Sequence, residues 1–155
     1  MKITSSVEYA TRIMVALARS HGGAKLPAEK LSESENVPVD YVNQILLRLR
    51  RAGLVESHRG LGGGYSLARE PSRVTLGEVA RAVEGRIFED VCGRYDEGEK
   101  DCHHQGNCSI SPVWHRLGAM IEEYFDGISL SRLLEEQGTC GKVAVMLDKI
   151  SPGKK

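Results

Sequence analysis

The sequence contains no apolar run that approaches the roughly 18 residues of a membrane-spanning helix. Its N-terminal stretch carries Glu8 and Arg12 inside an apolar pattern, which is typical of an amphipathic helix and not of a secretory signal. We therefore expect a cytoplasmic protein with no membrane partner. Thiols stay reduced in that compartment, so clustered cysteines there indicate metal or redox chemistry before disulfides.

An excess of charge of either sign is also missing, because 21 Lys and Arg residues balance 21 Asp and Glu residues. A net charge of zero does not by itself suggest a nucleic-acid-binding protein. Arginine is nevertheless concentrated in one place, since Arg48, Arg50, Arg51 and Arg59 fall within twelve residues with only Glu56 opposing them. A local cluster sets the field that a polyanion meets at close range, although a solvated helix face carries such charges too.

The first half of the chain shows three stretches of helical periodicity. The first helix is expected to begin near Ser5, which stands three residues before Glu8 in the pattern of a capping box. The second and third helices are expected near Pro27 and Pro38, because proline suits the first turn of a helix. Gly53 is expected to end the third helix as a C-terminal glycine.

A glycine-rich connection joins two short strand candidates after the third helix. The candidates are Leu54-Val55 and residues 65–67, and four of the five residues from Gly60 to Gly64 are glycine. These glycines suit an adaptable hairpin tip, whereas the order of a phosphate-binding loop is missing. Three helices followed by a hairpin is the order of a winged helix-turn-helix domain. We therefore predict a mainly α fold with a small β wing, in which residues 1–85 form that domain.

The third helix and the connection supply the candidate DNA contacts. The predicted set is Tyr41, Asn43, Gln44, Arg48, Arg51, Arg59, Gly62 and Gly63. The amides of Asn43 and Gln44 can bond the edge of adenine at two points, and the helix arginines can meet phosphate or guanine. Arg59 sits where a wing can carry an arginine into the minor groove. A polar, solvent-exposed helix face has the same residue types, so composition leaves both interpretations open.

Two of these stretches closely resemble a known family. YVNQILLRLRRAGLV followed by RGLGGGYSLAR is similar to the iron–sulfur cluster regulators of the IscR and NsrR type, the Rrf2 superfamily. ITSSVEYA, TLGEVARAVEG and the later cysteine-to-Trp114 region fit the same family in order, so the resemblance covers roughly residues 1–135. It implies a dimeric bacterial transcription regulator. Several members of this family sense iron–sulfur status, nitric oxide or redox state through a cluster.

Three of the four cysteines lie in one polar segment, CGRYDEGEKDCHHQGNC, within residues 86–109. Their spacing, Cys92-x9-Cys102-x5-Cys108, lacks the close cysteine pairs of zinc ribbons and fingers. From spacing alone, an iron–sulfur cluster, a zinc site and bare redox thiols all stay open. The resemblance implies a cluster of the two-iron kind (2Fe-2S), because the family uses three cysteines in this loop. The first spacing is longer here than in the namesake regulator.

Three cysteines leave one cluster ligand unassigned. The resemblance assigns it to Glu8, which aligns with an acidic residue that related members contribute from the first helix of the partner chain. The alternative role of Glu8 is the capping box. His103 and His104 are alternative ligands, and Cys140 is expected to be a free thiol. The namesake has a histidine three residues after its last cysteine, where this chain has Ser111, which we expect to cap the next helix.

Residues 110–137 are expected to form a dimerisation helix and a short terminal helix. The apolar stripe of the longer helix is Val113, Trp114, Leu117, Met120, Ile121, Tyr124 and Phe125. This stripe is too wide for the remaining chain to cover, so we expect burial against a second copy in a two-fold homodimer. The alternative is packing on its own domain. Residues 138–155 are expected to form a flexible tail.

These features predict a DNA-binding transcription regulator whose operator binding is controlled by an iron–sulfur cluster. One alternative is the same regulator with zinc or bare redox thiols. Another, from a different class, is a small thiol enzyme or electron carrier. A catalytic cysteine needs a base and an orienting group, and the loop offers no apolar pocket around one. An electron carrier has no use for the arginine cluster or the glycine-rich wing.

Overall fold

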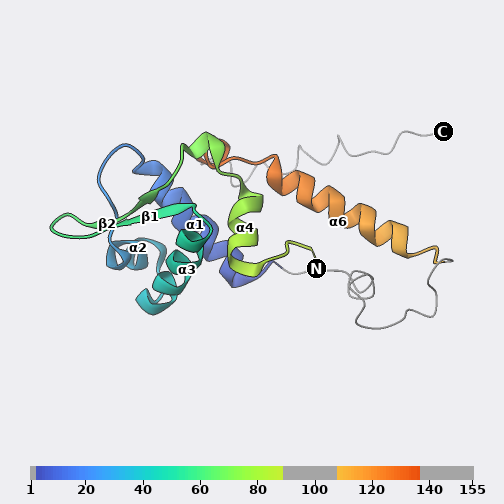
Figure 1. Ribbon diagram of the computed structural model, residues 1–155, viewed down its shortest axis with the longest axis horizontal. Helices are drawn as coiled ribbons and strands as arrows, with labels where there is room; N and C mark the ends of the chain where they lie inside the picture. The colour runs from blue at the N-terminus through green and yellow to red at the C-terminus, as the bar shows by residue number, and fades with distance from the viewer. Residues whose placement is uncertain (1–2, 89–107, 137–155) are drawn as a thin grey trace.

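The computed structural model describes residues 3–88 and 108–136, and it confirms the mainly helical fold with a small β wing (Figure 1). The elements follow in the order α1 (Ser5–Arg19), α2 (Ala28–Glu35), α3 (Val39–Arg51), β1 (Val55–His58), β2 (Gly64–Leu67), the 3-10 turn η1 (Pro71–Arg73), α4 (Leu76–Glu84), α6 (Ser111–Asp126) and α7 (Leu130–Glu135). Helices α1 to α4 and the hairpin gather in one body, and α6 projects from it on the side opposite the wing (Figure 1).

One hydrophobic core holds the winged-helix domain together. Helix α1 contacts α2, α3, α4 and α7, while α3 also packs against α2 and α4. The largest fully buried side chains are Ile13, Met14, Leu17, Leu31, Val42, Ile45, Leu46, Leu49, Leu54, Val55, Val74 and Leu130. The helical periodicity predicted for α3 is confirmed, because its apolar positions Val42, Ile45, Leu46 and Leu49 all lie in this core. The opposite face of α3 is therefore left to solvent.

Helix α3 ends at the predicted glycine. Gly53 has a φ of 71°, and its N–H donates to the Arg50 carbonyl at 3.0 Å. The N–H of Leu54 donates to the Leu49 carbonyl at 3.0 Å, so the two bonds form a Schellman motif. This turn leads the chain directly into β1 and places the wing beside α3.

The wing is an antiparallel pair that runs from Val55 opposite Leu67 to His58 opposite Gly64. An isolated bridge fastens it to the α1–α2 connection, since the backbones of Leu26 and Tyr65 exchange hydrogen bonds of 3.0 and 2.8 Å. Gly64 lies at this crossing, where a Cβ atom would come within 2.7 Å of the Leu26 carbonyl. Only glycine lets the two backbones approach this closely.

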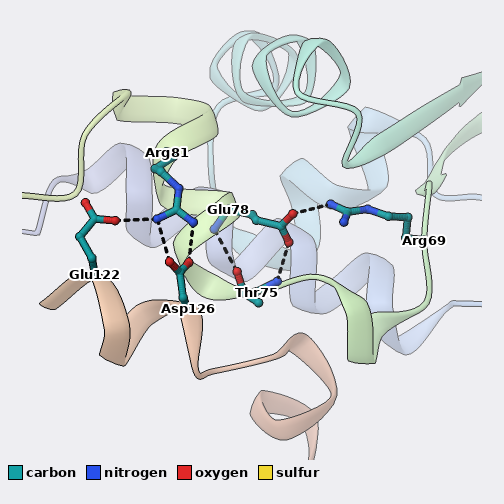
Figure 2. Close-up of polar contacts among 6 residues, drawn as sticks. All are labelled: Arg69, Thr75, Glu78, Arg81, Glu122 and Asp126. Atoms are coloured by element: carbon teal, nitrogen blue, oxygen red, sulfur yellow. Dashed lines mark hydrogen bonds and ion pairs between the residues drawn. The ribbon is translucent and has the colours of Figure 1, made fainter. Parts of the chain in front are cut away.

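A capping box fixes the start of α4 (Figure 2). The Thr75 hydroxyl accepts from the Glu78 N–H at 3.2 Å, and the Glu78 carboxylate accepts from the Thr75 N–H at 3.0 Å. Arg69 donates to the other Glu78 carboxylate oxygen at 2.9 Å. Burial acts to raise the pKa of Glu78, but the bonds from Thr75 and Arg69 outweigh it and lower the pKa. The carboxylate is therefore held in its charged form.

Helix α6 exposes its apolar stripe. Its large apolar side chains Val113, Trp114, Leu117, Met120 and Tyr124 are 38–65% exposed. The described part of the chain buries no residue of this helix. Packing on its own domain, the alternative for this stripe, therefore leaves these five side chains uncovered. Within residues 3–88 and 108–136, no helix is both long and apolar enough to cross a membrane.

Helix α7 returns to the core of the winged-helix domain. Leu130 is fully buried, and its N–H donates to the Val74 carbonyl at 2.9 Å. Next to it, the Leu76 N–H donates to the Ile128 carbonyl at 2.8 Å. The two helices of the expected segment 110–137 therefore lie apart. Helix α7 packs on α1 and η1, whereas α6 projects away from them.

Helix α1 begins at Ser5, as predicted, but the predicted capping box of Ser5 and Glu8 is wrong. The N-cap is Thr4, whose hydroxyl accepts from the Val7 N–H at 3.3 Å. Ser5 lies in the first turn, and Glu8 takes no part in a capping box. Sequence could not separate two neighbouring residues that cap a helix equally well.

Candidate nucleic-acid interface

The solvent face of α3 carries the predicted recognition residues. Asn43, Gln44 and Arg51 are exposed, on the side of the helix opposite its buried positions. Leu47 lies on the same face, 41% exposed. Two amides, a guanidinium and an aliphatic side chain can together read base edges and contact phosphate.

Two other predicted residues of α3 have partners within the chain. Arg48 donates from Nη1 to the carbonyl of Val83 in α4 at 2.7 Å. The Tyr41 hydroxyl lies 2.8 Å from the Ser6 hydroxyl of α1, and its ring packs edge-on against Tyr9. Both contacts fix the position of α3 against the rest of the domain.

The tip of the wing presents Arg59 to solvent. The turn is closed by the Gly63 N–H, which donates to the Gly60 carbonyl at 2.9 Å. Gly62 has a φ of 76°, and a Cβ on Gly63 would lie 2.5 Å from the His58 carbonyl oxygen. The predicted glycines therefore shape the tip that carries Arg59, and they leave its backbone open to a close approach.

A cleft between α2, α3 and the wing brings in a residue that was not in the predicted set. Its lining includes Asn43 and Arg50 of α3, Ser57 of β1 and Arg59 of the tip. Arg50 donates to the Ser57 hydroxyl at 3.1 Å and so links α3 to the wing. The available signal was its spacing of seven residues, or two helical turns, from Asn43.

Cys108 is the predicted cluster ligand that falls within the described residues. Its half-buried thiol accepts from the Ser111 N–H at 3.4 Å. The expected cap of α6 is wrong by one residue, because Ile110 is the N-cap and no side chain caps this end. Cys108 therefore lies at the start of α6, where its sulfur is bonded to a backbone N–H of the first turn.

Glu8, the predicted fourth ligand, is exposed on α1. It forms one loose ion pair, with 3.9 Å to Arg12. Arg12 is held more closely by Glu35 of α2, at 3.0 Å. Because the capping box that would occupy Glu8 does not form, its carboxylate can turn toward a ligand.

The other predicted ligands, Cys92, Cys102, His103 and His104, lie outside the described residues, as does Cys140. Residues 3–88 and 108–136 hold no cluster of three or more His, Cys, Asp or Glu side chains that could bind a metal ion by themselves.

Comparison with known proteins agrees with this geometry. Residues 3–136 match the model of the Rrf2 family, described as iron-dependent transcriptional regulators. The HTH-type transcriptional regulator IscR of Aliivibrio salmonicida is 34% identical over 134 residues, which make up 86% of this chain and 77% of that protein.

Solved structures give the same result. CymR, the global cysteine regulator of B. subtilis, is similar with a TM-score of 0.72 and 28% identity, over 87% of this chain and 97% of that one. IscR of T. potens is similar with a TM-score of 0.68 and 26% identity, over 99% of this chain and 94% of that one. These relatives are transcription regulators and not enzymes, which confirms the resemblance found in the sequence. The chain belongs to the Rrf2 family of transcriptional regulators.

Proposed function

We propose that the chain is a homodimeric regulator that binds operator DNA through α3 and the wing, under the control of an iron–sulfur cluster. The observation that carries this proposal is the cleft that the exposed Asn43 of α3 shares with Arg59 at the wing tip. Regulators of this family bind DNA, and a helix with an adjacent wing fits the major groove beside the minor groove.

The amides are suited to base recognition and the arginines to the DNA backbone. Asn43 and Gln44 can each bond adenine in two places, whereas Arg50 and Arg51 lie about two turns further along the helix. Arg48 is better suited to holding α3 in position, since its guanidinium is bonded to the Val83 carbonyl. Arg59 can enter the minor groove from the wing.

The exposed stripe of α6 supports the homodimer. Its five large, exposed apolar side chains form a contiguous apolar surface, and such surfaces on soluble proteins mark interaction sites. A second copy offers the same stripe, and a two-fold axis brings the two stripes together. Two DNA-binding domains on one dimer would then meet two operator half-sites.

The described residues fit a cluster at two points. Cys108 offers a sulfur at the positive end of α6, and the loosely held carboxylate of Glu8 offers an oxygen ligand. We assign the remaining ligands to Cys92 and Cys102, with His103 or His104 as alternatives to Glu8. When bound, a 2Fe-2S cluster supplies a centre that responds to iron supply, oxidants or nitric oxide.

If Glu8 comes from the partner chain, its helix α1 and the cysteine segment of the first chain become connected. Helix α1 lies in the DNA-binding domain. Loss or oxidation of the cluster would release this connection and so change the distance between the two α3 helices of the dimer. This gives two states with different operator affinity, which is what allosteric control requires.

The test is purification without oxygen, followed by the visible absorption spectrum and analysis of iron and acid-labile sulfide. Wild-type protein is expected to be coloured, Cys108→Ser to lose the colour, and Glu8→Ala to change the spectrum. Glu33→Ala, which removes an exposed carboxylate from α2, is the matched control and should leave the spectrum as it is.

Operator binding by the two forms completes the test. Apo and cluster-bound protein should differ in affinity for the same duplex at fixed salt. Equal affinities would rule out control by the cluster. A colourless protein with stoichiometric zinc, or with none, would favour the second candidate, a thiol or zinc regulator, which the similarity to the cysteine regulator CymR supports.

A further inference from the structure

Arg81 of α4 forms a polar link between the winged-helix domain and α6 (Figure 2). Its guanidinium grips Asp126 through two bonds, of 2.5 Å to Oδ1 and 3.2 Å to Oδ2. The same group donates to Glu122 at 2.6 Å. Glu122 and Asp126 are four residues apart, so Arg81 holds one full turn of α6.

The shape of this contact restricts how α6 can be oriented. A guanidinium is planar and forms two parallel bonds to a carboxylate, which fixes angle as well as distance. The Asp126 carboxylate also lies directly against Gly77 of α4, in the space that a side chain there would fill. Further along α6, Gly118 packs against the ring of Phe88, where a Cβ would come within 2.8 Å.

Helix α4 is also hydrogen-bonded to α3 and to the residue that precedes α1. Arg48 of α3 donates to the Val83 carbonyl at 2.7 Å, and the Thr4 hydroxyl at the start of α1 donates to Glu84 at 2.8 Å. An arginine contact therefore joins the recognition helix to α4, and a second one joins α4 to α6. The orientation of α6 is carried to α3 through one short helix.

We propose that Arg81 is a positioning residue that sets the angle between α6 and the winged-helix domain, and through it the spacing of the operator half-sites that the dimer accepts. This inference rests on the proposed function, because α6 must be the dimer helix and α3 the DNA-reading helix. Arg81 itself has no contact with DNA in this scheme. Its effect is expected only when two half-sites are bound at once.

The experiment measures binding to duplexes with different half-site spacing. A duplex with two half-sites is first selected from a random library by the wild-type protein, then varied by one or two base pairs at its centre. Each added base pair turns one half-site by roughly 34° relative to the other. Wild-type protein should prefer the selected spacing by about tenfold or more.

Arg81→Ala is expected to reduce this preference to within about threefold, through weaker binding at the selected spacing. Binding to a duplex with a single half-site should stay within about twofold of wild type. Arg69→Ala is the matched control, because it removes the same charge from a carboxylate pair that lies inside the winged-helix domain (Figure 2). It should keep the spacing preference.

Gly77→Ala provides a variant that changes no charge. The added methyl group would displace the Asp126 carboxylate, which is the end of a side chain and can move without disturbing the core. It should reproduce the effect of Arg81→Ala, and it decides the question if Arg81→Ala does not fold.

The outcomes separate the two levels of the argument. Wild-type protein that is monomeric in sedimentation, or that selects no two-part site, would contradict the proposed function. Wild-type protein with a clear spacing preference that Arg81→Ala and Gly77→Ala both retain would contradict the role of Arg81 alone.

Discussion

Helices α1 and α6 are similar in length and are both amphipathic, but the described part of the chain buries only α1. Helix α1 spans 15 residues and places six in the core, whereas α6 spans 16 residues and has none buried by the described part of the chain. Periodicity predicts an apolar face in both. It does not say what covers that face, which is the rest of the domain for α1 and, in our proposal, a second copy for α6.

The largest expected effect lies in the buried region. Leu46 of α3 is fully buried, and Leu46→Ala should lower the free energy of unfolding by about 3 kcal/mol, because it leaves a cavity in the core. Urea denaturation at fixed protein concentration measures the change. The neighbouring Leu47 is 41% exposed, so Leu47→Ala should cost less than about 0.5 kcal/mol. Equal losses of stability for Leu46→Ala and Leu47→Ala would contradict the burial of one face of α3 and the exposure of the other.

Substitutions on the exposed stripe of α6 should weaken dimer association and leave the folding of the domain unchanged. Trp114→Ala removes the largest side chain of its exposed stripe, and we expect the dimer to weaken by about 2 kcal/mol, or roughly 30-fold in Kd. Sedimentation over a range of concentrations measures this constant. Glu123→Ala, an exposed position off the stripe, is the control. An unchanged Kd for Trp114→Ala would exclude this face as the dimer interface.

Features set by local periodicity could be predicted from the sequence. The buried stripe of α3, the glycine that ends it and the hairpin after it follow from residue order over a few turns, and the structure agrees. The exposed face that carries Asn43 and Arg59 follows from the same patterns. The exact cap of α1 could not be predicted, because Thr4 and Ser5 both carry a hydroxyl that can cap a helix and only the backbone angles distinguish them.

Contacts between distant residues could not be predicted. Arg81 and Asp126 are 45 residues apart, and Arg48 and Val83 are 35 apart. Each looks in the sequence like an ordinary surface charge or an ordinary apolar residue. Only the packing of α4 between α3 and α6 brings them together, so the sequence predicts neither contact.

A cap variant should give a smaller effect than the core. Thr4→Ala removes the hydroxyl that caps α1 and bonds Glu84, and should lower the free energy of unfolding by about 1 kcal/mol. Ser5→Ala, one residue on, should change it by less than about 0.5 kcal/mol. Thermal or urea unfolding of both variants decides which residue is the cap. A larger loss of stability for Ser5→Ala than for Thr4→Ala would identify Ser5 as the cap.

The smallest effect should be visible only as a dependence on pH. Burial acts to raise the pKa of Glu78, but the Thr75 and Arg69 bonds lower it overall, so folding favours the charged carboxylate. Its contribution to stability is therefore present above the ordinary value of 4.5 and is lost as the pH falls through the lowered pKa. Glu78→Gln should be less stable than wild type by about 0.5 kcal/mol at neutral pH, because the partly exposed ion pair is screened by solvent.

The gap between wild type and Glu78→Gln should close in acid, as the wild-type carboxylate takes up its proton. Unfolding free energies measured in urea from neutral pH to well below 4.5 give the curve. Glu123→Gln removes a carboxylate from the exposed surface of α6 and should leave stability unchanged at neutral pH. If the difference in unfolding free energy between wild type and Glu78→Gln stayed constant into acid, the charge of Glu78 would not be its cause. The charge of the Glu78 carboxylate would then add nothing to the stability of the fold.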